Sequence, residues 1–264
     1  MRFEAELAKG GTFVRLRVRR GPVGGGRRGE IKDFSHQSQR RMLDFFNKLP
    51  RAYRSQALFI TLTYPREFSP DRRDWKRDLD VFFKRFARRF PDAVSLWKLE
   101  FQRRGAPHFH VLVWGCDFVP VGWLSRVWYN VVGSDDPRHL AAGTQVQEVR
   151  NEENAVAYLF KYIVKEDRSG NRVCTGRIWG VRNRKCCPTA LAHHTIETVE
   201  FYSTRRQLRR WLEGRLGRKV TWSRRAGEGL TAYIDTEQAS RLFDSLDADA
   251  ARGEVNSELV RCES

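Results

Sequence analysis

The stretch Glu-Phe-Gln-Arg-Arg-Gly-Ala-Pro-His-Phe-His-Val-Leu-Val-Trp-Gly, residues 100–115, decides the fold of this chain. Side chains of a strand alternate between its two faces, so His108 and His110 share one face while the apolar residues Phe109 and Val111 point to the other. Residues 94–102 alternate in the same way and place Glu100 opposite their large apolar side chains. The Gly and Pro between the two runs predict a tight connection. A hairpin folded there brings Glu100 beside both histidines.

Glu100, His108 and His110 form a candidate metal site, called the metal triad below. Two imidazoles and a carboxylate that converge on one sheet face leave coordination positions open, which suits a divalent cation that must also hold a substrate oxygen. The alternative is that both histidines are polar residues on a solvated strand face. The position of Glu100 and a second group of residues further along the chain favour the metal site.

The second group lies in residues 154–165, which are predicted to form an amphipathic helix. Tyr158 and Tyr162 fall one turn apart on one stripe together with Lys165, and Lys161 lies at the edge of that stripe. A tyrosine that attacks a phosphodiester needs nearby positive charge, because a free phenol has a pKa of about 10. The alternative is that both tyrosines are half-buried core residues with solvated hydroxyl groups.

Three ordered motifs resemble those of the HUH endonucleases, above all the rolling-circle replication initiators (Rep proteins) of single-stranded DNA phages and plasmids. They are Phe-Ile-Thr-Leu-Thr-Tyr at 59–64, Glu100 followed by Gly-Ala-Pro-His-Phe-His at 105–110, and Tyr-Leu-Phe-Lys-Tyr at 158–162. Gly-Arg-Ile-Trp-Gly-Val at 176–181 is similar to a segment that often follows the tyrosine helix in those initiators. The tyrosine motif follows the histidine motif here, which favours initiators and related transposases over relaxases.

The resemblance implies a site-specific enzyme that nicks and joins single-stranded DNA through a 5′-phosphotyrosine intermediate and so starts rolling-circle replication. The metal triad would hold one Mg²⁺ or Mn²⁺ ion. Tyr158 would attack the scissile phosphate, while Tyr162 could make a second attack and Lys161 could stabilise phosphate charge. The family contains members with one tyrosine and members with two, and this sequence fits both patterns. A transposase with the same chemistry and a non-enzymatic single-stranded nucleic-acid-binding protein are the alternatives.

The composition points to a polyanionic partner. The chain has 49 Lys and Arg against 32 Asp and Glu, a formal net charge of +17, and single-stranded origin DNA is the expected partner. No apolar run approaches the ~18 residues that span a bilayer, so a cytoplasmic protein of a bacterial host with no membrane partner is expected. Because the sequence has no P-loop, a host helicase is expected to separate the strands and a host polymerase to extend the free end. Five cysteines without a repeated Cys-x-x-Cys spacing predict reduced thiols.

Three regions are predicted along the chain: a basic N-terminal arm with an edge strand (1–34), an HUH endonuclease domain (35–203) and a basic C-terminal extension with an acidic tail (204–264). The expected helices cover 35–49, 69–90 and 121–132, the expected strands cover 58–64, 144–149 and 195–203, and 134–143 is expected to be a loop. Strands and amphipathic helices that alternate around a hairpin predict an α+β protein. The predicted architecture is a ferredoxin- or RRM-like antiparallel sheet with helices on one face, and the open face would carry the metal site.

Overall fold

The computed structural model describes residues 2–8, 12–19, 34–151, 155, 158, 159, 176–189, 191–219, 230–232, 234 and 241. The chain divides into two compact units. The terminal unit comprises residues 1–26, 44–50 and 189–264, and the central unit comprises residues 27–43 and 51–188. This grouping differs from the predicted regions 1–34, 35–203 and 204–264, because strands from both ends of the chain pair with each other.

The central unit is built on a five-stranded antiparallel sheet in the order β6-β3-β5-β4-β7. Its strands are β3 (Ala57–Thr63), β4 (Val94–Phe101), β5 (Pro107–Trp114), β6 (Thr144–Val149) and β7 (Trp179–Arg182). Together with the helices α3 (Arg72–Arg89) and α4 (Val121–Val131), the chain runs β3-α3-β4-β5-α4-β6. This is the βαββαβ order of ferredoxin-like folds, and the predicted α+β class is confirmed.

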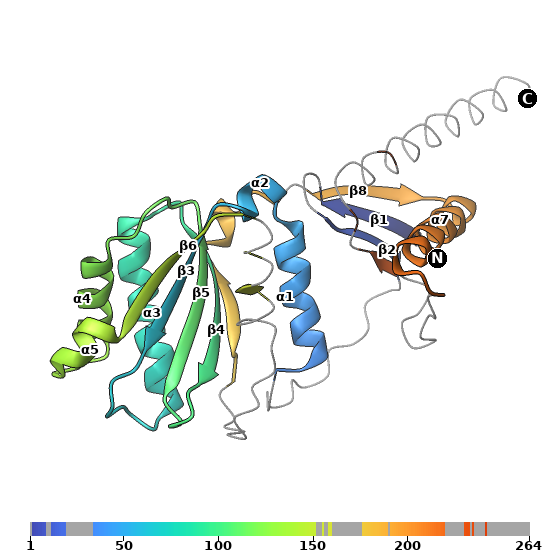
Figure 1. Cartoon of the computed structure of the whole chain (residues 1–264). Helices are drawn as coiled ribbons and strands as arrows, with labels where there is room; N and C mark the ends of the chain where they lie inside the picture. Colours follow the sequence, from blue (N-terminus) through green and yellow to red (C-terminus); the bar gives the residue numbers. More distant parts are fainter. Residues whose placement is uncertain are drawn as a thin grey trace, which may run out of the picture. The chain divides into compact units, whose positions relative to one another are not determined.

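One face of this sheet packs against α3 and α4, which lie side by side on it (Figure 1). The aromatic residues of α3 recur on one helical stripe, so Phe82 points at the sheet. The ring of Trp128 from α4 meets Phe82 edge-on at 5.9 Å and Phe109 of β5 edge-on at 6.3 Å. All three rings are almost fully buried. The apolar side of the predicted hairpin therefore forms the core, and the histidine side faces away from α3 and α4.

Residues 134–143, expected to be a loop, contain the short helix α5 (Pro137–Ala142). Asp136 caps it by accepting a hydrogen bond from the backbone of Arg138, and Pro137 occupies its first turn. Proline is pre-organised for that position. The prediction was wrong because six residues are too few to show an apolar stripe, although His139 of this helix reaches the carbonyl oxygen of Thr63 at 2.8 Å.

A tight turn joins β4 to β5. Gly105 adopts φ 77° there, which glycine tolerates without steric cost, and the Gln102 amide donates to the Ala106 carbonyl at 3.0 Å. The guanidinium of Arg104 reaches from this turn to the carbonyl oxygens of Tyr64 at 2.5 Å and Pro65 at 2.7 Å. These bonds fix the chain after β3 against the end of the hairpin that carries Glu100 and His108.

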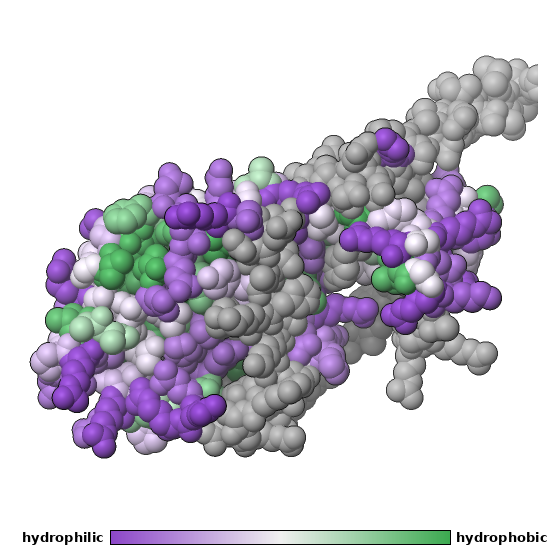
Figure 2. Space-filling view, viewed as in Figure 1, coloured by the Kyte–Doolittle hydropathy of each residue, from purple (hydrophilic) through white to green (hydrophobic). Residues whose placement is uncertain are grey.

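The outer side of α3 is basic, but part of its charge is neutralised locally. Arg77 pairs with Asp74 at 2.7 Å and Lys84 pairs with Asp80 at 2.9 Å. Figure 2 shows that hydrophobic side chains also gather over α3 and α4 within a hydrophilic surround. Exposed apolar residues in this region are Phe118 and Val121. A helix face with internal ion pairs and apolar neighbours has the features of a solvated surface, the interpretation that competes with a track for DNA.

The terminal unit holds a second antiparallel sheet in the order β8-β1-β2-β9. Its elements are β1 (Arg2–Ala8), β2 (Val14–Arg19), β8 (Leu191–Ile196), β9 (Leu230–Ala232) and the helix α7 (Thr198–Leu216). The expected edge strand of the arm is thus β2, which has a neighbour on both sides. The expected strand over 195–203 is wrong beyond Ile196, because Glu197 and Glu200 form a capping box that starts α7.

Two helices occupy the segment between β2 and β3. They are α1 (His36–Lys48) and α2 (Arg51–Arg54), and Pro50 separates them. The expected helix over 35–49 is therefore confirmed to within a residue at each end. Among the described residues, none of the helices is both long and apolar enough to cross a membrane. Cys116, Cys186 and Cys187 are free thiols, as expected, while Cys174 and Cys262 lie outside the described residues.

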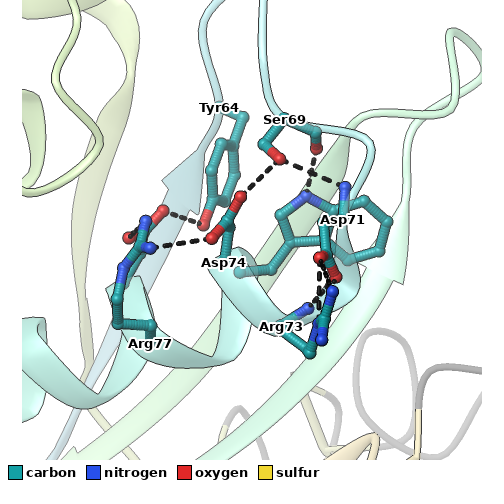
Figure 3. A network of polar contacts seen from close by, with 8 residues as sticks. Tyr64, Ser69, Asp71, Arg73, Asp74 and Arg77 are labelled. Atoms are coloured by element: carbon teal, nitrogen blue, oxygen red, sulfur yellow. Dashed lines mark hydrogen bonds and ion pairs between the residues drawn. The ribbon is translucent and has the colours of Figure 1, made fainter.

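A polar network joins the end of β3 to the start of α3 (Figure 3). The hydroxyl of Tyr64 donates to Asp78 at 3.0 Å in a buried position, and Arg77 also bonds Asp78 at 3.2 Å. Ser69 bonds Asp74 at 2.6 Å one turn earlier. Burial and the neighbouring Asp78 raise the pKa of Tyr64, so its hydroxyl stays a donor at neutral pH. The network positions α3 against the sheet without contributing to the opposite face.

Replacing Tyr64 by phenylalanine should lower the free energy of unfolding by about 1.5–3 kcal/mol, because a buried hydrogen bond to a carboxylate is lost. Denaturant unfolding measures the change. Tyr129→Phe is the matched control, since the Tyr129 ring stacks on His139 and its hydroxyl has no hydrogen bond within the described part of the chain. Equal stability of the two variants would show that the Tyr64–Asp78 bond contributes nothing.

Candidate metal and nucleophile site

The sheet face opposite α3 and α4 carries the metal triad. In the register of the sheet, His108 on β5 lies between Glu100 on β4 and Thr63 on β3. His110, two residues along β5, lies between Lys98 on β4 and Thr61 on β3. Successive side chains on one face of a strand are neighbours. The three predicted ligands are therefore brought together on adjacent strands, as the alternation predicted.

The Glu100 carboxylate is held at both of its oxygen atoms. Oε2 lies 3.2 Å from Nε2 of His110, and Oε1 lies 2.9 Å from Nζ of Lys98. Burial by itself would raise the pKa of Glu100, but the hydrogen bond from His110 and the positive charge of Lys98 outweigh burial and lower it overall. Glu100 is consequently ionised at neutral pH and is available as an anionic ligand.

His108 is neutral and is oriented by Thr63. The hydroxyl oxygen of Thr63 lies 2.9 Å from Nδ1 of His108, and the rings of His108 and His110 meet edge-on with centroids 4.5 Å apart. Burial, reinforced by the charge of His110, lowers the pKa of His108 to about 4. A hydrogen bond at Nδ1 leaves Nε2 as the atom that can bind a metal, an arrangement typical of histidine ligands.

The donor set fits a divalent cation, although its atoms are not gathered around one point. Among the described residues, no group of three or more His, Cys, Asp and Glu side chains stands ready to hold an ion. The hydrogen bonds at both Glu100 oxygens account for this. Two ligand atoms at about 2.1 Å from one ion and at right angles are about 3 Å apart, which is close to the 3.2 Å between Glu100 and His110. A carboxylate with two imidazoles suits Mn²⁺ or Mg²⁺ with open positions.

Tyr158 lies on the same sheet face as the triad. Its ring stacks on Phe59 of β3 with centroids 4.8 Å apart, and Phe59 in turn stacks on His110 at 5.3 Å. The hydroxyl of Tyr158 donates to Oε1 of Gln147 on β6 at 2.9 Å. One phenyl ring therefore separates the predicted nucleophile from a predicted metal ligand, and the hydroxyl group faces the edge of the sheet.

The rest of the predicted tyrosine helix is described only in part. The carbonyl oxygen of Asn151 accepts a hydrogen bond from the Ala155 amide at 3.1 Å, which is consistent with a helix that starts near Asn151. Ala155 and Leu159 are buried. Tyr162, Lys161 and Lys165 lie outside the described residues, so their predicted roles stay predictions.

Phe59, Gln147 and Lys98 contact the candidate site but were not predicted to do so. The alternation of β4 places Lys98 on the face of Glu100, and this was the only signal for it in the sequence. Phe59 and Gln147 face each other across β3 and β6. Their contact with Tyr158 follows from strand pairing, which local sequence patterns do not contain.

His108 should titrate near pH 4 in the metal-free protein, because burial disfavours its charged form. An unfolded histidine titrates near 6.5, so the unfolded chain binds more protons between these values and stability should fall as the pH drops from about 6.5 to about 4. Histidine NMR signals followed in the presence of a chelator measure the midpoint, and His108→Gln identifies the signal. A midpoint near 6.5 would contradict the buried position of this ring.

Comparison with known proteins points to replication. Residues 57–167 match the family of replication-associated proteins named for ORF2 and the gene 2 protein. The replication-associated gene 2 protein of Pseudomonas phage Pf3 is 27% identical over 204 residues, which are 70% of each chain. A protein of Xylella fastidiosa (strain 9a5c) named for replication is 28% identical over 169 residues, 58% of this chain and 57% of its own length. No solved structure matches the chain significantly. The segment that carries the metal triad and Tyr158 is therefore similar to replication-associated proteins of phages and bacteria.

Proposed function

We propose that this protein is an HUH-type Rep endonuclease that starts rolling-circle replication by nicking and joining single-stranded DNA. One observation carries the proposal: Tyr158 and the Glu100–His110 pair lie on the same sheet face, connected through the ring of Phe59. A phenol nucleophile and a candidate metal site on one face are the two parts that phosphodiester transesterification needs. The similarity to replication-associated proteins supports the same biological role.

Glu100 and the Nε2 atoms of His108 and His110 would hold one Mg²⁺ or Mn²⁺ ion. Such an ion would polarise a non-bridging oxygen of the scissile phosphate and orient the phosphate for in-line attack. Thr63 fixes the ring of His108 for this task, and Lys98 and His110 keep Glu100 ionised. The protein side of the site is thus arranged before the substrate arrives.

Tyr158 would supply the nucleophile. Its phenol oxygen forms a bond to phosphorus while the bond from phosphorus to the 3′ oxygen breaks. The phenol proton passes to solvent, and the departing 3′ oxygen takes up a proton to become the free 3′-OH that primes synthesis. The products are a 5′-phosphotyrosine and a 3′ end, so the bond energy is retained and rejoining requires no nucleotide. Tyr158 must first leave its hydrogen bond to Gln147.

Tyr162 would make the second attack that ends a round of replication, and Lys161 would stabilise phosphate charge. Single-stranded origin DNA is the proposed substrate, consistent with the formal net charge of +17. A host helicase and a host polymerase would act at the same replicon in the bacterial cytoplasm. A transposase would use the same chemistry on different DNA ends.

Tyr158→Phe should abolish the covalent adduct between the protein and single-stranded origin DNA, with a fall in adduct formation of at least about a hundredfold, because it removes the nucleophile. The measurement is the amount of adduct on a denaturing gel after incubation with Mn²⁺. Tyr162→Phe is the matched control and should still form the first adduct. Adduct formation by Tyr158→Phe at the wild-type rate would contradict the assignment of Tyr158. DNA binding that is independent of metal, with no adduct from the wild type, would favour the non-enzymatic alternative.

Thr63→Val should weaken Mn²⁺ binding by about 10- to 100-fold, because the partner that orients a histidine ligand is lost. Titration calorimetry on the full chain measures the dissociation constant. Thr61→Val is the matched control: Thr61 lies two residues earlier on the same strand face, opposite His110, and its hydroxyl makes no hydrogen bond within the described residues. Equal losses in the two variants would show that the Thr63 hydroxyl has no specific role.

A further inference from the structure

Lys98 is a buried lysine on the sheet face that carries the metal triad. Its side chain is 1% exposed, its ammonium lies 2.9 Å from Oε1 of Glu100, and the centre of the Phe34 ring lies 4.9 Å from Nζ. Burying an ammonium is costly unless a carboxylate and good hydrogen-bond geometry compensate for the lost hydration. Glu100 provides that carboxylate. Lys98 is accordingly fixed on one oxygen of the acidic member of the triad.

The two oxygen atoms of Glu100 therefore differ. Oε1 faces Lys98, whereas Oε2 faces Nε2 of His110 at 3.2 Å. An ion placed between Glu100 and the histidines meets Oε2, while Oε1 is occupied by a donor that is buried and cannot turn to solvent. Lys98 is also the direct neighbour of His110 across the two strands. The lysine thus approaches the carboxylate from the side of β4 and leaves the side of His110 free for an ion.

We propose that Lys98 is a positioning residue that restricts Glu100 to one metal-binding oxygen and thereby makes the site select Mg²⁺ or Mn²⁺ against Ca²⁺. Small ions with six ligands accept a carboxylate through one oxygen, whereas Ca²⁺ takes six to eight oxygen ligands and often binds both oxygens of a carboxylate. The inference rests on the proposed function, since it requires a metal at the triad.

Comparing two divalent ions separates this role from simple charge repulsion. Removal of the Lys98 charge should strengthen the binding of every divalent cation, because the repulsion between an ammonium and a doubly charged ion is lost. That effect is common to Ca²⁺ and Mn²⁺ and cancels in the ratio of their dissociation constants. The freed Oε1 atom benefits Ca²⁺ more, so the ratio reports on the geometry of the carboxylate.

The experiment measures the dissociation constants of Ca²⁺ and Mn²⁺ by titration calorimetry on the full-length wild type and on Lys98→Met. The Ca²⁺/Mn²⁺ ratio of dissociation constants should fall by about tenfold or more in Lys98→Met, because the carboxylate can then bind Ca²⁺ through both oxygens. Lys98→Arg, which retains a cationic donor, should keep the wild-type ratio. Lys84→Met should also keep it, since Lys84 pairs with Asp80 at 2.9 Å on the exposed side of α3.

Glu100→Gln separates the two levels of the argument. Loss of Mn²⁺ binding in Glu100→Gln together with an unchanged ratio in Lys98→Met overturns the role of Lys98 and leaves the proposed function intact. Mn²⁺ binding that does not depend on Glu100 overturns the metal site and the inference with it. If Lys98→Met does not fold by circular dichroism, a structure of the wild type with Mn²⁺ decides: Glu100 bound through both oxygens overturns the proposal, and Glu100 bound through Oε2 alone with Lys98 on Oε1 supports it.

Discussion

The register between β4 and β5 is the constraint on which the candidate site depends. It sets Glu100 opposite His108 and Lys98 opposite His110, and every polar contact of the triad follows from these two pairs. A slip of one residue would turn the histidines into the core and expose Phe109. The turn at Gly105 and the bonds from Arg104 to the chain after β3 fix this register at the end of the hairpin nearest to the site.

The core on one side of the sheet permits polar chemistry on the other. The aromatic residues of α3 and α4 bury the apolar side of β5, and hydrophobic burial of this extent stabilises the sheet independently of its second face. That second face can then hold a buried lysine, a buried carboxylate and two histidines, whose desolvation opposes folding. Their mutual pairing limits that cost, because each charge finds a partner of opposite sign or a hydrogen-bonding donor.

The sequence predicted what depends on local periodicity and missed what depends on pairing between distant segments. The alternation at 94–102 and 107–114 was enough to place Glu100 and both histidines on one face, and the aromatic stripe of α3 was enough to place the core. The strand β1 and the full extent of β8 were missed, because they belong to a sheet assembled from both ends of the chain. Phe59 and Gln147 escaped for a related reason: their contact with Tyr158 joins three elements.

The position of Tyr158 says how the site must change during the proposed reaction. Its hydroxyl bonds Gln147, which is paired with Phe59, whereas His108 is paired with Thr63, four residues further along β3. Four residues of a strand extend about 13 Å, so the phenol oxygen and the triad are at different levels of the sheet. Phe59 is buried between the rings of Tyr158 and His110, and a phosphate cannot enter there. The nucleophile must therefore swing past Phe59 towards the end of the sheet at Thr63. Gln147 holds Tyr158 in a withdrawn position until DNA draws it across.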